Sequence, residues 1–578
     1  MSFFSQLNLS GRYLEIIKRF PVVILFAIVT TFALLVLIDD TTKGDIIRWP
    51  ICGFIGFLAM LNWSLAKEAY TLSQGIYRIG VVVIIAALGV YYFMIPTNFD
   101  EKISCFWYFT IGLSLILHFL ISIIPFFKTR NNDAFTAYNV HIFISWMQSA
   151  LYSIIFYTAL SLAILALDNL FDIKLDGIIY FKLFILVTGL LQTTFFLSEI
   201  PDQFYNTEVP AQKSIFKIIT SYVFIPICII YGLILYAYIL RVLITGKPMV
   251  EWAYVMILWY FVVGLSSWLF SGYYDNAADN PLMSKFRKYF FLFSILPVIL
   301  LFLSLFKNIS LYGIKEEYYL SAAVAIFIAI TTIYMIVSKI RDKRILPLLL
   351  ILLSLITFMG GSFSVCNVPV MNQQRKLVHD LEACGIISDG VIQIDTSRTY
   401  SDTNGIISNK LYFLDSRNAL GYLKEFDKNN LIKKAADSIN AYQLQELFRL
   451  DRYTSKMDQK AWNVYFSSKK SVDIVGYEKI IPVKYIKELN EITDYIVLTE
   501  EGHINLYINN AEIGRLDVNK VIFGMSNHPD GSNIVESNLG GYKIKIIVES
   551  ASGEKTVDKI TVTSLQGIVL IKQAEVGQ

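Results

Sequence analysis

The sequence predicts a membrane α-helical bundle of about 11 transmembrane helices, followed by an extracytoplasmic α+β domain with an antiparallel sheet. The first observation is composition. Hydrophobic residues make up 55% of the 578 residues and charged residues only 17%, against about a quarter charged in soluble domains. The second is a series of eleven apolar runs before residue 363, and the third is the ordinary soluble composition that follows. A soluble globular enzyme and a disordered chain are therefore excluded.

The eleven runs are each near the ~20 residues that an α-helix needs to cross about 30 Å of hydrocarbon. Some are short or interrupted, so ten or twelve spans remain possible. The first run lacks a small-residue cleavage site and continues into Asp39 and Asp40, which indicates a signal anchor. The predicted spans are 20–38, 46–66, 77–95, 105–127, 142–167, 178–198, 222–243, 252–271, 290–306, 319–338 and 345–363.

The distribution of Lys and Arg predicts the orientation. Alternate loops on the side of the N-terminus hold 16 of these residues, whereas the other side holds 8. Because cytoplasmic loops carry the excess of positive charge, the N-terminus is expected in the cytoplasm of a bacterium. The polytopic domain (1–363) then lies in the inner membrane, and the domain 364–578 faces the periplasm. A net charge of +3 gives no reason to expect a nucleic acid, so the expected partners are the lipid bilayer and an envelope protein.

The C-terminal domain divides into a helical lead-in (364–450) and a sheet-rich part (473–578). Apolar spacing predicts a helix over 371–384, with a stop at Gly385, and a second helical zone from about 429 to 450. Alternating patterns from Tyr495 onward predict three strands and then a hairpin. The turns of this sheet are expected at Glu501–Gly502, Asn509–Asn510 and Ser552–Gly553.

No catalytic, cofactor-binding or metal-ligating motif is present. Walker A, HExxH, GxSxG and CxxC patterns are absent, and five histidines are scattered. The candidate intramembrane polar residues are His118, Gln148, Gln192 and Glu199. A deep His118 suggests a proton path or, more simply, a neutral imidazole bonded to a neighbouring helix.

The cysteines give a second set of expectations. Cys52, Cys105 and Cys228 lie in or at the ends of spans and are expected to be small apolar fillers. Cys366 and Cys384 fall on the oxidising side, where a disulfide could form. A helix over 371–384 would hold them too far apart to pair, so the geometry argues against that bond.

Three stretches resemble a known family. The first is the tyrosine-rich helix IPICIIYGLILYAYILRVL, the second is SLYGIKEEYYL, and the third is SVCNVPVMNQQRKL at the start of the C-terminal domain. In this order they resemble the bacterial multi-pass membrane proteins called "domain of unknown function 4153", best over about 140–425. The residues that carry the resemblance are Pro226, Tyr231, Tyr236, Tyr238, Tyr312, Gly313, Glu317, Tyr319, Asn372, Gln373 and Lys376.

The resemblance implies no established activity, and this chain departs from the pattern at two places. Gly360–Gly361 stands where a Gly-Pro is frequent, and Asn372–Gln373 stands where a Ser-Gln is expected. Physically, Tyr231 and Tyr238 share one helix face and either pack there or hydrogen-bond across the bundle. Gly313 could supply a positive φ for a turn, and its loop could dock on the helix that follows the last span.

Three functions remain open. The favoured one is a non-enzymatic envelope scaffold, sensor or assembly component that presents the periplasmic domain. The alternatives are a secondary transporter or lipid-handling permease and, less favoured, a membrane enzyme acting on lipid-linked substrates. A transporter would need a water-accessible polar cavity at mid-membrane depth, whereas a scaffold would have a dry bundle.

Overall fold

The computed structural model divides into two compact units. One, here the helical unit, comprises residues 1–396 and 407–448, and the other, the sheet unit, comprises 397–406 and 449–578. The residues that the structure describes are 15–39, 46–96, 105–171, 175–205, 214–246, 252–273, 281–393, 404–432, 440–448, 450, 461–465, 477–483, 495–498, 503–508, 511–517, 534–539, 541–555 and 560–573.

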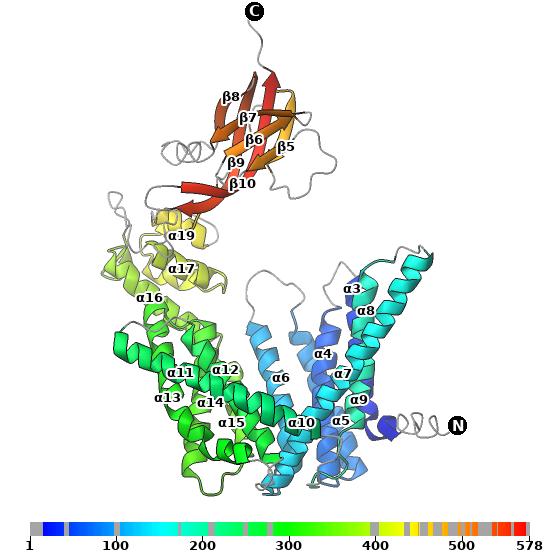
Figure 1. Cartoon of the computed structure of the whole chain (residues 1–578). Coiled ribbons are helices and arrows are strands. Elements are labelled where there is room, and N and C mark those ends of the chain that lie inside the picture. The colour runs from blue at the N-terminus through cyan, green and yellow to red at the C-terminus, as the bar shows by residue number, and fades with distance from the viewer. Residues whose placement is uncertain are drawn as a thin grey trace, which may run out of the picture. The chain divides into compact units, whose positions relative to one another are not determined.

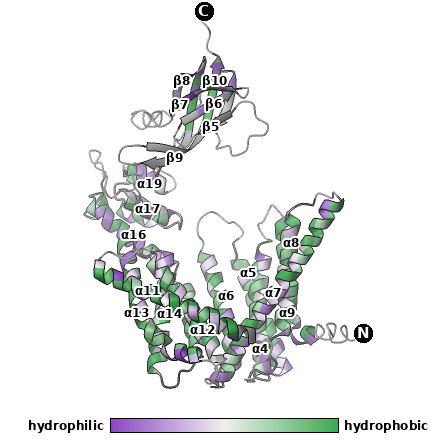
Figure 2. Cartoon of the chain, in the orientation of Figure 1, coloured by the Kyte–Doolittle hydropathy of each residue, from purple (hydrophilic) through white to green (hydrophobic). Residues whose placement is uncertain are grey.

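Most of the helical unit consists of long apolar helices (Figures 1 and 2). Among the described residues, ten helices are long and apolar enough to cross a membrane, and Ile345–Met359 is a shorter apolar helix. Their exposed leucine, isoleucine, valine and phenylalanine side chains fit a lipid bilayer. The prediction of a multi-span membrane protein is therefore confirmed, with ten long helices and a shorter one at the places of the eleven expected runs.

The helices form two groups that pack side by side (Figure 1). The first group shares a core with Phe20, Leu61, Phe126 and Tyr138, and the second shares one with Tyr260, Phe290 and Leu301. The first group contains α3 (Pro21–Asp39), α4 (Arg48–Ala69), α5 (Gln74–Met94), α6 (Cys105–Ile123), the 3₁₀ turn η1 (Ile124–Phe126), α7 (Asn132–Phe171), α8 (Ile178–Leu186), the π-helix η2 (Val187–Gln192) and α9 (Thr193–Ser198). The second contains α10 (Ser214–Ile219), the π-helix η4 (Thr220–Phe224), α11 (Ile225–Thr245), α12 (Ala253–Tyr273), α13 (Pro281–Tyr312), α14 (Glu316–Val337) and α15 (Ile345–Met359).

The two groups meet where α15 packs on α6 and α12 packs on α7. A glycine permits the first of these contacts. A Cβ on Gly112 of α6 would lie 2.3 Å from the Cβ of Phe358 in α15, closer than packed carbon atoms allow. Small residues of this kind let helix backbones approach in a membrane.

Short helices and a two-stranded sheet follow the last apolar helix and complete the helical unit. The helices are the 3₁₀ turn η5 (Gly361–Phe363), α16 (Asn367–Ala383), α17 (Asn404–Asp415), the 3₁₀ helix η6 (Leu420–Phe426) and α19 (Ala441–Leu447), and the strands are β1 (Ile387–Ser388) and β2 (Val391–Ile392). The predicted helix over 371–384 is confirmed as α16, and Gly385 ends it with a φ of +70°. The helical lead-in therefore packs with the apolar helices, although its composition is that of a soluble segment.

The sheet unit is antiparallel throughout its described strands. β9 (Tyr542–Lys555) and β10 (Ile560–Gln573) form a long central pair in the order β3-β9-β10-β4, with β3 (Ala461–Tyr465) and β8 (Ile534–Leu539) both pairing with β9. β4 (Lys479–Val483) borders β10, and β5 (Tyr495–Leu498), β6 (His503–Ile508) and β7 (Ala511–Asp517) form a second sheet.

The three strands predicted from Tyr495 onward are confirmed as β5, β6 and β7. The turns expected at Glu501–Gly502 and Asn509–Asn510 lie outside the described residues. The turn expected at Ser552–Gly553 is wrong, because β9 continues through both residues and Ser552 pairs with Ser564 and Asn463. A strand that pairs on both edges gains enough backbone hydrogen bonds to extend through a Ser-Gly pair that resembles a turn.

Candidate functional site: the junction of α13, α14 and α16

The residues that carry the family resemblance meet where the loop between α13 and α14 contacts α16. α13 ends at Tyr312, and Gly313 follows with a φ of +77°. This left-handed conformation favours glycine because it has no Cβ. The expectation that Gly313 provides a turn is confirmed. We call this contact region the junction site.

Side chains of α16 bind the backbone of that loop. Asn372 Oδ1 accepts a hydrogen bond from the Ile314 amide at 2.8 Å. Gln373, which is only 1% exposed, donates through Nε2 to the carbonyl oxygens of Tyr312 at 3.0 Å and Ile314 at 3.2 Å. The predicted docking of the loop on this helix is therefore confirmed.

Lys376 caps the end of α13 one turn farther along α16. Its Nζ donates to the carbonyl oxygens of Ser310 at 2.9 Å and Ile309 at 3.2 Å. The last carbonyls of a helix have no partner within the helix, and a cation is favourable there. Burial and the nearby Lys410 ammonium lower the pKa of Lys376, and Asp380 opposes that shift. Lys410 itself pairs with Asp380.

Gly313 also leaves the space that Gln373 needs. A Cβ at position 313 would lie 2.6 Å from Gln373 Nε2 and 3.1 Å from Asn372 Oδ1. Any larger residue would push the amide away from the two carbonyls that it binds. The glycine and the glutamine therefore depend on each other.

The amino-terminal end of α14 belongs to the same site. Tyr319 donates a hydrogen bond to the Phe363 carbonyl. Glu316 forms an ion pair with Arg417, and both side chains are 13% exposed. Glu317 is exposed on the same turn, and within the described part of the chain it forms no ion pair. Of the two glutamates, the residue that holds the junction is thus Glu316, which sequence reasoning did not single out.

A disulfide joins the junction site to α6. Cys105, the first residue of α6, bonds Cys366, the residue before α16, with a Cα–Cα distance of 5.7 Å across 261 positions. The expectation that Cys105 is an apolar filler is wrong. Cys384 follows the other end of α16 and forms no disulfide, as the geometric argument predicted. Cys52 and Cys228 are buried free thiols.

The candidate intramembrane polar residues do not form one site. His118 lies on an exposed face of α6, where Nδ1 is 2.8 Å from the Ser114 carbonyl of its own helix. The expected bond to a neighbouring helix is therefore not found. Gln148 and Gln192 are half-buried on α7 and η2, and Glu199 follows α9. The Glu199 carbonyl interacts with His141 Nε2 at 2.8 Å. Within the described parts of the chain, no hydrogen bond joins any two of the four.

The tyrosines of the first family stretch lie on α11, which begins directly before Pro226. Tyr236 donates a hydrogen bond to the Phe293 carbonyl of α13 at 2.7 Å. Tyr231 and Tyr238 pack against the core of the second helix group. Tyr236 thus provides an interhelical hydrogen bond, and Tyr231 and Tyr238 contribute to the packing of the same helices.

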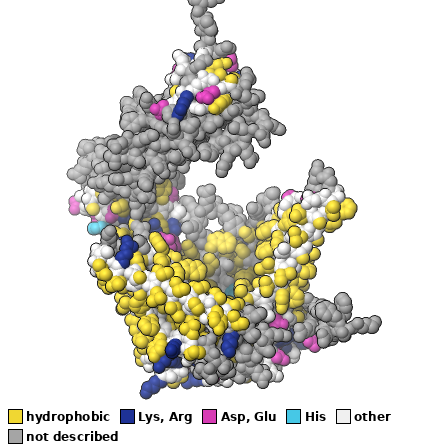
Figure 3. All heavy atoms as spheres, in the orientation of Figure 1, with side chains coloured by type: hydrophobic (Ala, Val, Ile, Leu, Met, Phe, Trp, Pro, Cys, Tyr) yellow, Lys and Arg dark blue, Asp and Glu magenta, His cyan; other side chains and the backbone are white. Residues whose placement is uncertain are grey.

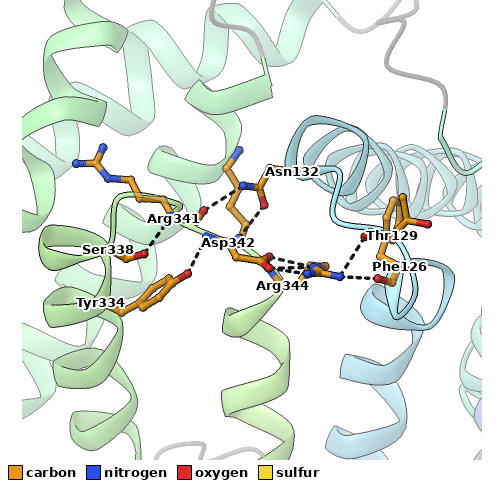
Figure 4. A network of polar contacts seen from close by, with 9 residues as sticks. Phe126, Thr129, Asn132, Tyr334, Ser338, Arg341, Asp342 and Arg344 are labelled. Carbon is orange, nitrogen blue, oxygen red and sulfur yellow. Dashed lines mark hydrogen bonds and ion pairs between the residues drawn. The ribbon is translucent and has the colours of Figure 1, made fainter.

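A second polar network lies at the other end of α14 (Figure 4). We call it the loop network, formed by the α14–α15 loop (338–344) and its partners. Arg344 pairs with Asp342 at 2.6 Å, with side chains 11% and 19% exposed. It also donates to the carbonyls of Phe126 at 2.9 Å and Thr129 at 3.1 Å. Asn132 accepts from the Lys343 amide at 3.0 Å and donates to the Arg341 carbonyl at 3.3 Å. These bonds join the two helix groups.

Sequence reasoning missed the loop network and two participants of the junction site. Arg344 is only one of the positive loop charges in the sequence analysis, which does not consider Asp342. Arg417 and Glu316 lie 101 positions apart. Lys and Arg residues beside a membrane span are expected simply because cytoplasmic loops carry an excess of positive charge. The local pattern therefore does not distinguish an arginine in an ion pair from a solvated one. The described residues contain no group of three or more His, Cys, Asp or Glu placed to hold a metal ion.

Comparison with known proteins places the chain in one family. No curated protein and no solved structure matches it. The family described as "Domain of unknown function (DUF4153)" matches residues 22–397, which include the apolar helices, the loop network and the junction site except Arg417. This chain therefore belongs to the DUF4153 family.

Proposed function

We propose that this chain is an inner-membrane protein with a cytoplasmic N-terminus, acting as a non-enzymatic envelope scaffold, sensor or assembly component. Its membrane part (1–363) would present the C-terminal α+β domain (364–578) to an envelope protein in the periplasm. The observation that carries the proposal is the disulfide between Cys105 and Cys366. Disulfides persist in oxidising compartments such as the bacterial periplasm.

The disulfide and the charge bias agree on the orientation. Three apolar helices precede Cys105 and eleven precede Cys366, so both cysteines fall on the side opposite the N-terminus. The 16-to-8 excess of Lys and Arg independently assigns that side to the periplasm. The start of α16 would then lie at the periplasmic surface of the inner membrane.

The bonding of the junction site supports a structural role. Asn372, Gln373 and Lys376 direct their hydrogen bonds to backbone groups at the end of α13 and in the α13–α14 loop. Side chains used in this way fix the position of α16 and do not remain available for a substrate. A membrane enzyme acting on lipid-linked substrates is less favoured for this reason.

Reporter fusions test the orientation. An alkaline phosphatase fused after Gln578 should be active, and the same enzyme fused within the 338–344 loop should be inactive. A fluorescent protein that matures only in the cytoplasm should give the reverse pattern. Fluorescence from the fusion after Gln578 would refute the proposed topology.

A transporter or permease is the second candidate, and one feature favours it. The π-helix η2 packs on α7, and Phe224 of η4 packs against a cluster that contains Ile144 of α7. π-helical turns occur often at functional sites. Ser145 and Ser153 of α7 are buried, and their hydroxyls have no partner in the described structure.

Cysteine accessibility separates the two candidates. In a background in which Cys52, Cys228 and Cys384 are replaced by alanine, Ser145→Cys and Ser153→Cys are treated in whole cells with a membrane-impermeant thiol reagent. The scaffold proposal predicts that both thiols stay unmodified, as in a dry bundle. Modification of both would favour a water-filled path and the transporter.

A further inference from the structure

A buried lysine lies in the loop network beside α7 and α12. Lys343 is only 6% exposed, although lysine is almost never fully buried without a partner. Its backbone amide is held by Asn132 in the first turn of α7. Its ammonium lies 5.8 Å from the centre of the Trp268 ring of α12.

The Lys343 ammonium has one hydrogen-bond acceptor among the described residues. Nζ donates to Thr136 Oγ1 at 2.6 Å, and the Thr136 hydroxyl donates in turn to the Asn132 carbonyl at 2.7 Å. An ammonium carries three donors, so two remain without an acceptor. In the described structure no carboxylate forms an ion pair with Lys343, and a buried charge of this kind is costly.

A second cation faces the same point. A Cβ on Gly272 of α12 would lie 3.4 Å from Lys343 Nζ and 3.6 Å from Arg287 Nε, in ordinary van der Waals contact with both. Trp268 fixes the Arg287 backbone through a hydrogen bond from Nε1 to its carbonyl at 3.2 Å. Burial and the Arg287 charge lower the pKa of Lys343 to about 8, and Asp133 opposes the shift.

We propose that Lys343 and Arg287 form a binding site for a phosphate group at the end of the helical unit opposite the junction site. A guanidinium and an ammonium that converge on one point bind several oxygens of one anion, which phosphate provides. The bound anion would supply the missing acceptors of Lys343 and separate the two like charges.

Two sources of phosphate fit this place. Lys and Arg side chains gather at the lower end of the helices in Figure 3, below the broad hydrophobic band, where phospholipid headgroups meet a membrane protein. The group could therefore belong to an anionic lipid or to a soluble phosphate. The chemistry of the site is the same in either case.

The test uses the full chain purified in detergent, with thermal unfolding as the readout. Sodium phosphate is compared with sodium chloride at equal ionic strength. Detergent micelles that contain phosphatidylglycerol are compared with detergent micelles that contain phosphatidylcholine. Lys343→Met removes the buried charge but keeps the length of the side chain. Lys339→Met changes an exposed lysine of the same loop and serves as the matched control.

In the unsubstituted chain, we expect sodium phosphate or phosphatidylglycerol to raise Tm. The ligand that raises Tm shows whether the phosphate group comes from a soluble phosphate or from an anionic lipid. Lys343→Met should keep or raise the Tm measured without ligand, because an apolar side chain replaces a buried charge. Its apparent affinity for the ligand should fall about tenfold or more, as for a lost charged hydrogen bond. Lys339→Met should keep both properties.

Three results would overturn the proposal. One is the absence of a Tm increase with either phosphate source in the unsubstituted chain. The second is an equal loss of the ligand response in Lys339→Met and Lys343→Met, which would indicate a general effect of charge. A lower Tm in Lys343→Met with an unchanged ligand response would likewise assign Lys343 a purely structural role.

Discussion

The junction site and the loop network stand at opposite ends of α14, and each holds a loop by side-chain bonds to backbone groups. At the junction site neutral amides bind the α13–α14 loop, an ion pair joins Glu316 to Arg417, and a disulfide adds a covalent link. In the loop network an arginine–aspartate pair provides the central contacts. The first should therefore respond to reduction and to steric change, and the second to pH.

The difference also concerns what each site joins. The junction site attaches α16 to the ends of α13, α14 and α6 that lie beside it, whereas the loop network joins the two groups of apolar helices to each other. In the proposed orientation, the covalent link lies on the side where oxidation can form it, and the loop network on the opposite side has only charges and hydrogen bonds.

The largest expected effect comes from the disulfide. Cys105→Ser should lower the free energy of unfolding by about 4 kcal/mol, because the bond closes a very long loop in the unfolded chain. Denaturant titration in detergent measures this, and Cys366→Ser should match it. Cys384→Ser is the control and should leave stability unchanged. Equal losses in Cys384→Ser and Cys105→Ser would contradict the pairing.

Substitutions of Gly313 and Gly361 distinguish the cost of steric crowding at the junction site from the cost of backbone strain alone. Gly313→Ala should cost about 2–3 kcal/mol, because alanine must adopt a positive φ and also displace the Gln373 amide. Gly361→Ala should cost only about 1 kcal/mol, since Gly361 has a φ of +56° but open space around it. The same denaturant titration compares them. Equal costs would show that Gln373 does not need the space.

Two adjacent glutamates test which residue holds α14 to the region around Arg417. Glu316→Gln should cost about 1–2 kcal/mol, because it weakens a charged hydrogen bond between largely buried side chains. Glu317→Gln should change stability by less than about 0.5 kcal/mol, as for an exposed side chain. Thermal unfolding of the two variants in parallel provides the comparison. A larger loss from Glu317→Gln would reverse the assignment.

The smallest effect is a pH dependence confined to the loop network. Hydrogen bonds from Arg344 hold the pKa of Asp342 below its ordinary value of 3.8. A carboxyl with a lowered folded pKa contributes stability above the ordinary pKa, and this contribution is lost as the pH falls through the folded pKa. Asp342→Asn should therefore reduce the acid sensitivity of Tm below pH 3.8. An unchanged acid profile would show that the Asp342–Arg344 pair contributes nothing measurable.

Much of the helical unit follows from local pattern. Apolar runs near twenty residues predict the positions of the helices, because the backbone must satisfy its hydrogen bonds internally in a bilayer. The spacing of Leu377 and Leu381 likewise predicts α16, and Gly385 predicts its end. The turn at Ser552–Gly553 was misplaced because a local turn signal yielded to pairing on both edges of β9.

The membrane class, the places of the apolar helices and the residues of the junction loop could be predicted, because each depends on hydrophobicity or on short-range geometry. The pairing of Cys105 with Cys366, the contact of Glu316 with Arg417 and the approach of Lys343 to Arg287 became visible only in the folded chain. These contacts join positions 56 to 261 residues apart. Which distant side chains meet depends on how the helices pack, and no local pattern records that packing.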